Sequence, residues 1–263
     1  MGPVDLTSYL AGAPAFYADV EAVSARDLQR AELVALPFAA LALLLVFRTV
    51  VGALTPLIVG GASVTVVLAL LYLVGQLTDL SVFVLNLSTM LGLGLAIDYS
   101  LFLTSRFREE LRQHPVPAAL ERTVGTAGQA VVYSGLTVLI GMAGLLTFQI
   151  MFLRSVGVAG VIVVLLAGLG ATTLLPALLG VLGPRIDALR LLPEPPERGG
   201  FWGGLARRIM VRPWWVLLPT LALLLALGAP FLHVRLSSPD SSILPRDLES
   251  RQGYDILAAQ YGE

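Results

Sequence analysis

The sequence predicts an all-α polytopic membrane protein whose six transmembrane helices form a bundle. Hydrophobic residues make up 56% of the chain and charged residues 13%, whereas soluble domains carry about a quarter charged residues. Six stretches match the length of about 20 apolar residues that a helix needs to cross a bilayer. They are Leu33–Val51, Leu54–Gly75, Ser81–Thr104, Ala127–Phe148, Val156–Leu182 and Trp214–Leu232. Because lipid offers no hydrogen-bond partners to the backbone, runs of this length are predicted to be helices.

Composition excludes several classes of function. All 17 basic residues are arginines and the chain has no lysine, so the lysine of a nucleotide-binding P-loop is absent. The chain has no cysteine, which excludes disulfides and thiolate metal sites. No catalytic dyad is found at membrane depth, and His114 and His233 are isolated in the sequence and predicted to be solvated. We therefore expect no enzyme activity, metal, cofactor or nucleic-acid partner.

The arginines predict the orientation. One set of loops carries eleven arginines and the opposite set carries six, spread over longer tails. Cytoplasmic loops are the arginine-rich ones, so both chain ends are predicted to be extracytoplasmic, in a bacterial inner membrane. An outward N-terminal segment of about 30 residues without a signal peptide indicates that an upstream segment is missing.

The predicted organisation has five parts. Residues 1–32 end an extracytoplasmic segment, 33–182 form a five-helix transmembrane bundle, and 183–212 form a cytoplasmic linker with an interfacial helix. Residues 213–232 are the sixth transmembrane helix, and 233–263 begin a further extracytoplasmic domain with a helical stretch at Leu248–Tyr261.

Within the linker, a proline-rich stretch is followed by a short amphipathic segment. Its apolar positions are Phe201, Trp202, Leu205 and Ile209, with Arg207, Arg208 and Arg212 beside them. This pattern predicts a helix lying in the cytoplasmic interface. A passive anchor is the favoured interpretation, and recruitment of lipid is the alternative.

A single acidic residue, Asp98, lies deep within the six predicted spans. At about 1.5 Å per helical residue it lies roughly 12 Å inward from Arg106. An aspartate near the middle of a span costs on the order of 2.5–3.5 kcal/mol, so it is expected to face a protein interior or a water-filled path. The sequence therefore predicts that Asp98 is a proton relay and that Tyr99 supplies a hydroxyl at the same depth. The alternative is a protonated aspartate that only hydrogen-bonds two helices together.

Small residues around Asp98 predict close helix packing. They recur every four residues and are Ser88, Gly92, Ala96 and Ser100. Gly94 lies one turn before Asp98 and leaves room beside the carboxyl. Similar spacing occurs in the fourth and fifth spans, at Ser134, Thr137, Gly141, Gly160, Gly168 and Thr172. We interpret these mainly as packing positions.

The region around Asp98 carries a resemblance to a known family. It reads Gly92-Leu-Gly-Leu-Ala-Ile-Asp98-Tyr99-Ser-Leu-Phe-Leu-Thr-Ser-Arg106-Phe-Arg108-Glu109-Glu110-Leu. This run resembles the fourth transmembrane helix of the MMPL family (mycobacterial membrane protein large), part of the resistance–nodulation–division superfamily. Further likeness to the second through seventh helices lies at Leu45-Val-Phe-Arg48, Asn86-Leu-Ser-Thr, Ala127–Thr137, Leu175-Pro176-Ala-Leu-Leu and Arg212-Pro213.

The resemblance implies a bundle of the resistance–nodulation–division type and a secondary-active efflux transporter. Family members have twelve transmembrane helices in two halves, with extracytoplasmic porter domains. They use the proton gradient to export lipids or other hydrophobic compounds. By resemblance, Asp98 accepts the proton and Tyr99 hydrogen-bonds the aspartate of a second Asp-Tyr motif in the opposite half. Residues 1–32 would then end a porter domain, and the second half or a partner chain would be missing.

Two other functions remain open. A sterol-sensing domain, from the same superfamily, consists of helices two to six and binds lipid without a proton-titrating motif, so Asp98 argues against it. A half-transporter would obtain its second Asp-Tyr motif from a partner chain. In every case membrane lipids are expected partners.

Overall fold

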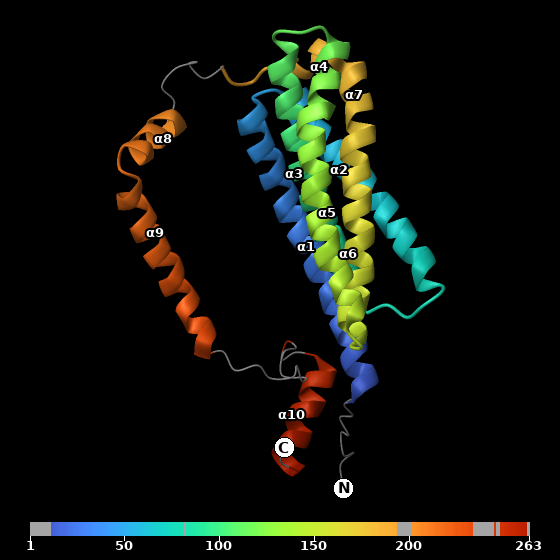
Figure 1. Cartoon of the computed structure of the whole chain (residues 1–263). Helices are drawn as coiled ribbons and strands as arrows, with labels where there is room; N and C mark the ends of the chain where they lie inside the picture. Colours follow the sequence, from blue (N-terminus) through green and yellow to red (C-terminus); the bar gives the residue numbers. More distant parts are fainter. Residues whose placement is uncertain (1–11, 82, 194–200, 234–244, 246–247, 262–263) are drawn as a thin grey trace. The chain divides into compact units, whose positions relative to one another are not determined.

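A computed structural model describes residues 12–81, 83–193, 201–233, 245 and 248–261. It confirms six helices that are long and apolar enough to cross a membrane (Figure 1). They are Pro14–Phe47, Val50–Gly75, Phe83–Leu111, Val116–Thr147, Met151–Asp187 and Pro213–Phe231. The chain is therefore an all-α multi-pass membrane protein.

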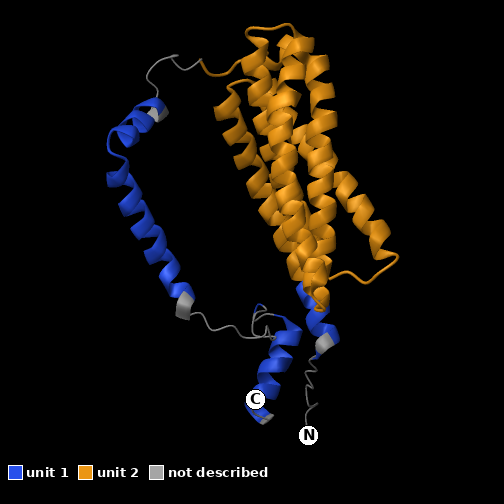
Figure 2. Cartoon of the chain, viewed as in Figure 1, with its two compact units in different colours: residues 1–20, 194–263 blue, residues 21–193 orange. Residues whose placement is uncertain are grey.

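The chain divides into two compact units (Figure 2). One comprises residues 21–193 and holds the first five spans, and the other comprises residues 1–20 and 194–263. The boundary after residue 193 falls inside the predicted linker.

The larger unit is a helical bundle that contains seven α-helices and four short helical turns. The α-helices are α1 (Ala13–Phe47, which starts in the smaller unit), α2 (Val50–Gly75), α3 (Phe83–Leu111), α4 (Val116–Thr123), α5 (Gln129–Gly144), α6 (Met151–Leu169) and α7 (Leu175–Leu182). The turns are η1 (Val124–Gly128), η2 (Leu145–Thr147), η3 (Gly170–Leu174) and η4 (Gly183–Asp187). Helix α3 packs against α2, α4 and α6, which places the predicted relay helix at the centre of these contacts.

The core of the bundle combines alanines with larger apolar side chains. On α3, Ala96 lets neighbouring helices approach, while Leu103 and Phe107 fill the space toward the arginine-rich end. Gly160 of α6 shows how tight the packing is, because a Cβ atom there would lie 2.6 Å from the Met142 sulfur of α5. Close packing of small residues supplies the dispersion contacts that hold helices together in lipid.

Several boundaries differ from the predicted ones. Helix α1 begins at Ala13, twenty residues before Leu33, because the polar stretch ahead of the apolar run is also helical. The fourth span is α4, η1 and α5 in continuous succession. Pro176 follows the π-helical turn η3, and the wider turn accommodates its missing N–H group. Pro37 lies inside α1, and Pro219 lies inside α9 (Pro213–Gly228).

The first part of the predicted linker is held against the bundle. Turn η4 and the segment after it are docked on the turn between α1 and α2. The Leu191 N–H donates to the Arg48 carbonyl (2.9 Å), and the Thr49 hydroxyl donates to the Ile186 carbonyl (3.1 Å). Arg48 adopts a positive φ of 61°, which turns its backbone toward this segment. The remainder of the linker, residues 194–200, lies outside the described residues.

The smaller unit contains α8 (Phe201–Val211), α9 (Pro213–Gly228), η5 (Ala229–His233) and α10 (Glu249–Tyr261). Helix α8 confirms that the predicted amphipathic segment is helical, and α10 confirms the predicted helical stretch near the C-terminus. The Ser250 hydroxyl donates to the Asp19 carboxylate in this unit. The segment between η5 and α10 falls largely outside the described residues.

Candidate functional site: an intramembrane carboxyl on the central helix

Asp98 lies on an exposed face of α3 rather than inside the bundle. Gly94, one turn before it, is also exposed, and a Cβ atom there would meet nothing within 4 Å. Asp98 forms no hydrogen bond or ion pair with any other residue whose position is described. The expected open space beside the carboxyl is present, and the described helices leave Asp98 exposed.

Tyr99 points into the bundle and is only 7% exposed. Its hydroxyl lies 3.6 Å from the place where a Cβ atom would stand on Gly135 of α5. That hydroxyl has no hydrogen-bond partner among the described residues. A buried tyrosine hydroxyl normally has one, so this group is available to a partner that the described residues do not supply.

The predicted small-residue stripe forms the packing face of α3. All four of its members, Ser88, Gly92, Ala96 and Ser100, are buried. Gly92 meets Val64 of α2 and Val163 of α6, because a Cβ atom there would lie 3.2 Å and 3.7 Å from their methyl groups. The stripe therefore packs against α2 and α6, while Asp98 projects from another side of the same helix.

Three hydroxyls on this packing face are buried without a partner among the described residues. They are Ser88, Ser100 and Thr104, each at most 1% exposed. By contrast, Thr89 of the same helix donates to the Leu85 and Asn86 carbonyls. Buried hydroxyls without partners are uncommon in folded proteins. Their presence makes the packing face of α3 more polar than contact with apolar neighbouring helices would need.

The small polar residues of α5 occupy an exposed face instead of a packed one. Ser134, Thr137 and Gly141 are all exposed, and a Cβ atom on Gly141 would meet nothing within 4 Å. Their predicted packing role is therefore not met by the described helices, although Gly160 of α6 does pack as predicted. Exposed α5 and exposed Asp98 both present polar groups at membrane depth.

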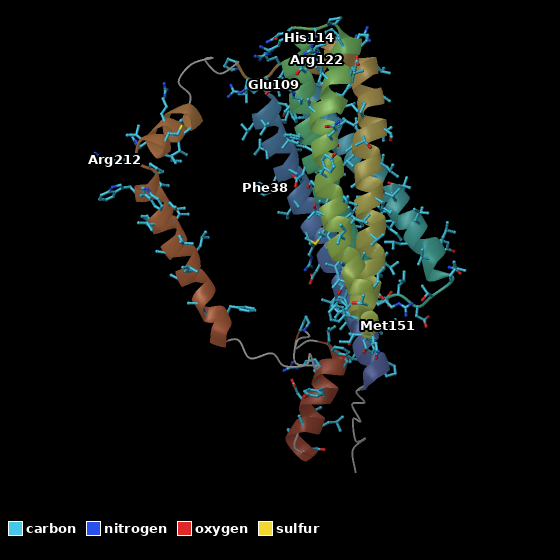
Figure 3. The ribbon with its side chains drawn as sticks, in the orientation of Figure 1. Phe38, Glu109, His114, Arg122, Met151 and Arg212 are labelled. Carbon is cyan, nitrogen blue, oxygen red and sulfur yellow. The ribbon has the colours of Figure 1, made fainter. Side chains whose placement is uncertain are left out.

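The arginine-rich end of α3 carries a cluster of charges. The Arg106 guanidinium contacts Glu109 at 3.1 Å and Glu110 at 2.6 Å. His114, predicted to be only solvated, is half-buried with Nδ1 3.3 Å from the Glu110 carboxylate. Glu109, His114 and Arg122 lie at one end of the bundle and Met151 at the other (Figure 3). The two contacts of Arg106 place opposite charges side by side at this end of α3.

Sequence reasoning missed a junction centred on Arg108. Its guanidinium binds the Asp187 carboxylate of η4 (2.5 Å and 2.7 Å) and donates to the Phe47 carbonyl at the end of α1 (2.8 Å). It also lies over the Phe47 ring, 5.6 Å from the centroid. The spacing of 79 residues between Arg108 and Asp187 leaves no local signal in the sequence.

An apolar groove of about 570 Å³ opens between α1, α2 and α3. Most of its lining is aliphatic, and Glu32 and Thr89 are its polar members. The described residues contain no group of three or more histidine, aspartate or glutamate side chains that could hold a metal ion.

Comparison with known proteins agrees with this architecture. The model of the MMPL family matches residues 2–216. A membrane protein of Streptomyces coelicolor is 39% identical, over 96% of this chain and 36% of its own length. The trehalose monomycolate exporter MmpL3 of Mycolicibacterium smegmatis is 34% identical, over 94% of this chain and 27% of its own length. The exporter of mycolic acid-containing lipids MmpL11 of the same organism is 32% identical, over 97% of this chain and 27% of its own length.

The chain thus spans roughly a third or less of the length of these relatives. The matched part includes α3, which carries Asp98, and the helices α2, α4 and α6 that pack against it. The chain belongs to the MMPL family.

Proposed function

We propose that this chain forms the second to seventh helices of a proton-driven exporter of lipids or other hydrophobic compounds. The observation that carries the proposal is Asp98, a carboxyl at mid-span on an exposed face of α3. Two of its relatives are named as exporters of mycolic acid-type lipids, which supports a lipid-like substrate. The arginine-rich end of the bundle faces the cytoplasm, and both chain ends are extracytoplasmic.

The exposure of Asp98 supports a second membrane part that covers it. A carboxyl facing lipid at this depth costs on the order of 2.5–3.5 kcal/mol, which favours a protein or water surrounding instead. Ser134, Thr137 and Gly141 of α5 are also exposed and are small enough for another helix to approach. The covering part is the other half of the transporter, with its own Asp-Tyr motif, or a partner chain that supplies one.

Asp98 takes up a proton from the outside and releases it toward the cytoplasm. Protonation removes the charge from the interface between the halves and favours one helix arrangement, while deprotonation favours the other. The Tyr99 hydroxyl, which has no partner among the described residues, hydrogen-bonds the aspartate of the opposite half. The alternation moves the porter domains and drives export.

The test uses a complete transporter that contains this segment, reconstituted in proteoliposomes with a proton gradient and a fluorescent lipid substrate. We expect Asp98→Asn to abolish both proton uptake and export, because an amide does not ionise and therefore cannot take up and release a proton as a carboxyl group does. Asp79→Asn is the matched control, since Asp79 is exposed in the turn after α2. Export that persists in the Asp98→Asn variant would overturn the relay.

The Tyr99→Phe variant distinguishes a role of the hydroxyl in export from a role in the stability of the chain. The substitution removes a hydroxyl that is unsatisfied in the described residues, so we expect unchanged thermal stability of this chain. In the complete transporter we expect the export rate to fall at least tenfold. The variant loses one hydrogen bond worth about 1.4 kcal/mol, and that free energy corresponds to a factor of ten. Full export by the variant would remove Tyr99 from the mechanism.

A lipid-binding module is a second candidate, and the groove between α1, α2 and α3 is the observation that favours it. Lipid that binds in the groove would raise the thermal stability of such a module, and this gain would not depend on Asp98. Leu57→Trp would fill the groove and remove that gain, while Asp98→Asn would not. A lipid effect that instead depended on Asp98 would count against this candidate.

A further inference from the structure

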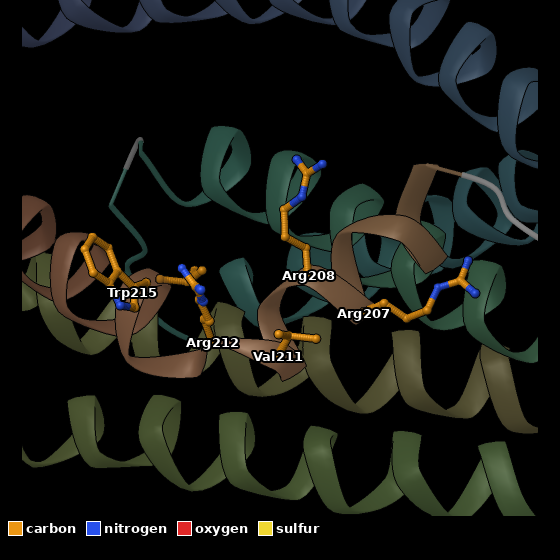
Figure 4. Close-up of a pocket in the computed structure, with 6 residues that line it drawn as sticks. Arg207, Arg208, Val211, Arg212 and Trp215 are labelled. Atoms are coloured by element: carbon orange, nitrogen blue, oxygen red, sulfur yellow. The ribbon is translucent and has the colours of Figure 1, made fainter.

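The turn from α8 into α9 forms a cationic and aromatic surface, which we call the arginine elbow. Its members line a recess of about 560 Å³ and are Arg207, Arg208, Val211, Arg212, Trp215 and Val216. In Figure 4 the Arg207 and Arg208 side chains extend in different directions from α8, and Arg212 lies beside Trp215. The positive charges are thus spread over a surface and do not converge on one point.

None of the three arginines forms an ion pair with another described residue. All three are exposed. Two other arginines near helix ends are paired in the described chain, Arg108 with Asp187 and Arg251 with Asp255. The elbow therefore carries three positive charges, and no described residue of its own unit forms an ion pair with them.

The position of the elbow is fixed by the membrane span that follows it. Helix α9 begins at Pro213, and the apolar span Pro213–Phe231 is not buried at all within the described structure. Trp214 and Trp215 are 67% and 77% exposed at its first turn. Tryptophans gather at the level of the lipid headgroups, so Arg212, two residues before Trp214, lies at that level, and the end of α8 that carries Arg207 and Arg208 leads directly into it.

We propose that the arginine elbow binds the headgroups of anionic phospholipids. A phosphate diester with net negative charge matches the exposed guanidinium groups, and the neighbouring Val211, Trp215 and Val216 contact the upper part of the acyl chains. An acidic protein partner would match the charge but not the apolar side of the recess, which continues into a membrane span. Each arginine near an anionic bilayer surface favours that surface over a neutral one by roughly fivefold.

The three tryptophans of the chain provide a direct probe. They are Trp202, Trp214 and Trp215, all within or next to the elbow in the sequence. Intrinsic tryptophan fluorescence of the full chain therefore reports on this region alone. The full chain is reconstituted in phosphatidylcholine vesicles that contain an equal mole fraction of brominated phosphatidylglycerol or brominated phosphatidylcholine, with bromine close to the headgroup.

We expect brominated phosphatidylglycerol to quench the fluorescence several-fold more effectively than brominated phosphatidylcholine, and the difference to shrink as salt is raised. The double variant Arg207→Gln/Arg208→Gln should lose most of this preference. Arg122→Gln/Arg185→Gln removes two exposed arginines outside the elbow and should keep it. Equal quenching by the two lipids in the unmodified chain, or an equal loss in both double variants, would overturn the proposal.

Discussion

Arg108 of α3 and Asp187 of η4 form a hydrogen-bonded ion pair, with Nη2 and Nε lying 2.5 Å and 2.7 Å from one carboxylate oxygen. The same guanidinium donates to the Phe47 carbonyl at the end of α1. One side chain therefore joins the ends of the first, third and fifth spans. It does so about three turns beyond Asp98 on α3.

Arg108→Gln is expected to destabilise the chain more than Asp187→Asn. The arginine change removes the charged donor to both Asp187 and the Phe47 carbonyl, at a cost of about 1.5–3 kcal/mol. The aspartate side chain is 39% exposed, so its loss is partly compensated by water and costs about 1 kcal/mol or less. Unfolding of the purified chain in detergent measures both, with the exposed Arg122→Gln as control. Equal effects of the two changes would contradict a central role for Arg108.

Thr49 is expected to hold the docked linker through its hydroxyl. It caps α2 by accepting from the Gly52 N–H (3.3 Å) and donates to the Ile186 carbonyl (3.1 Å). Thr49→Ala should lower the free energy of unfolding by about 1–3 kcal/mol, since both bonds are lost at a buried position. Thr49→Ser keeps the hydroxyl and should cost much less in the same denaturation assay. If the serine variant were as unstable as the alanine variant, the loss of stability would be due to the missing methyl group and its packing, and not to the hydroxyl.

Two glycines are expected to respond in opposite directions to alanine. A Cβ atom on Gly52 would lie 2.6 Å from the Thr49 hydroxyl oxygen and 3.2 Å from the Phe47 Cβ. Because that hydroxyl is held by two hydrogen bonds, Gly52→Ala should destabilise the chain by about 1–3 kcal/mol. Gly141→Ala, in open space on α5, should stabilise this chain by about 0.5–1 kcal/mol through helix propensity. Thermal unfolding of the two variants in detergent gives the comparison.

The exposed face of α5 is expected to become covered in the complete transporter. The absence of cysteine allows a nitroxide label to be attached at single introduced cysteines. At Ser134→Cys, the label should be accessible to oxygen dissolved in the lipid in this chain alone, and several-fold less so in the complete protein. Phe38→Cys, on the exposed side of α1, provides the comparison site. Unchanged accessibility at residue 134 would contradict a second half seated on α5.

The sequence by itself determined the six spans, the depth of Asp98 and the family. Long apolar runs must be helices in lipid because no other local structure pairs their backbone groups. The packing stripe was also predictable, since Ser88, Gly92, Ala96 and Ser100 repeat with the period of a helix and all four are buried. Helix α8 followed from the same kind of local pattern.

Only the tertiary structure decided which groups face each other. Adjacent residues on a helix point about 100° apart, so Asp98 and Tyr99 separate onto an exposed and a buried face once neighbours pack on one side of α3. The Arg108–Asp187 pair and the docking of residues 183–193 join segments far apart in the chain. No local pattern encodes such contacts, because they depend on how the helix ends come together in the bundle.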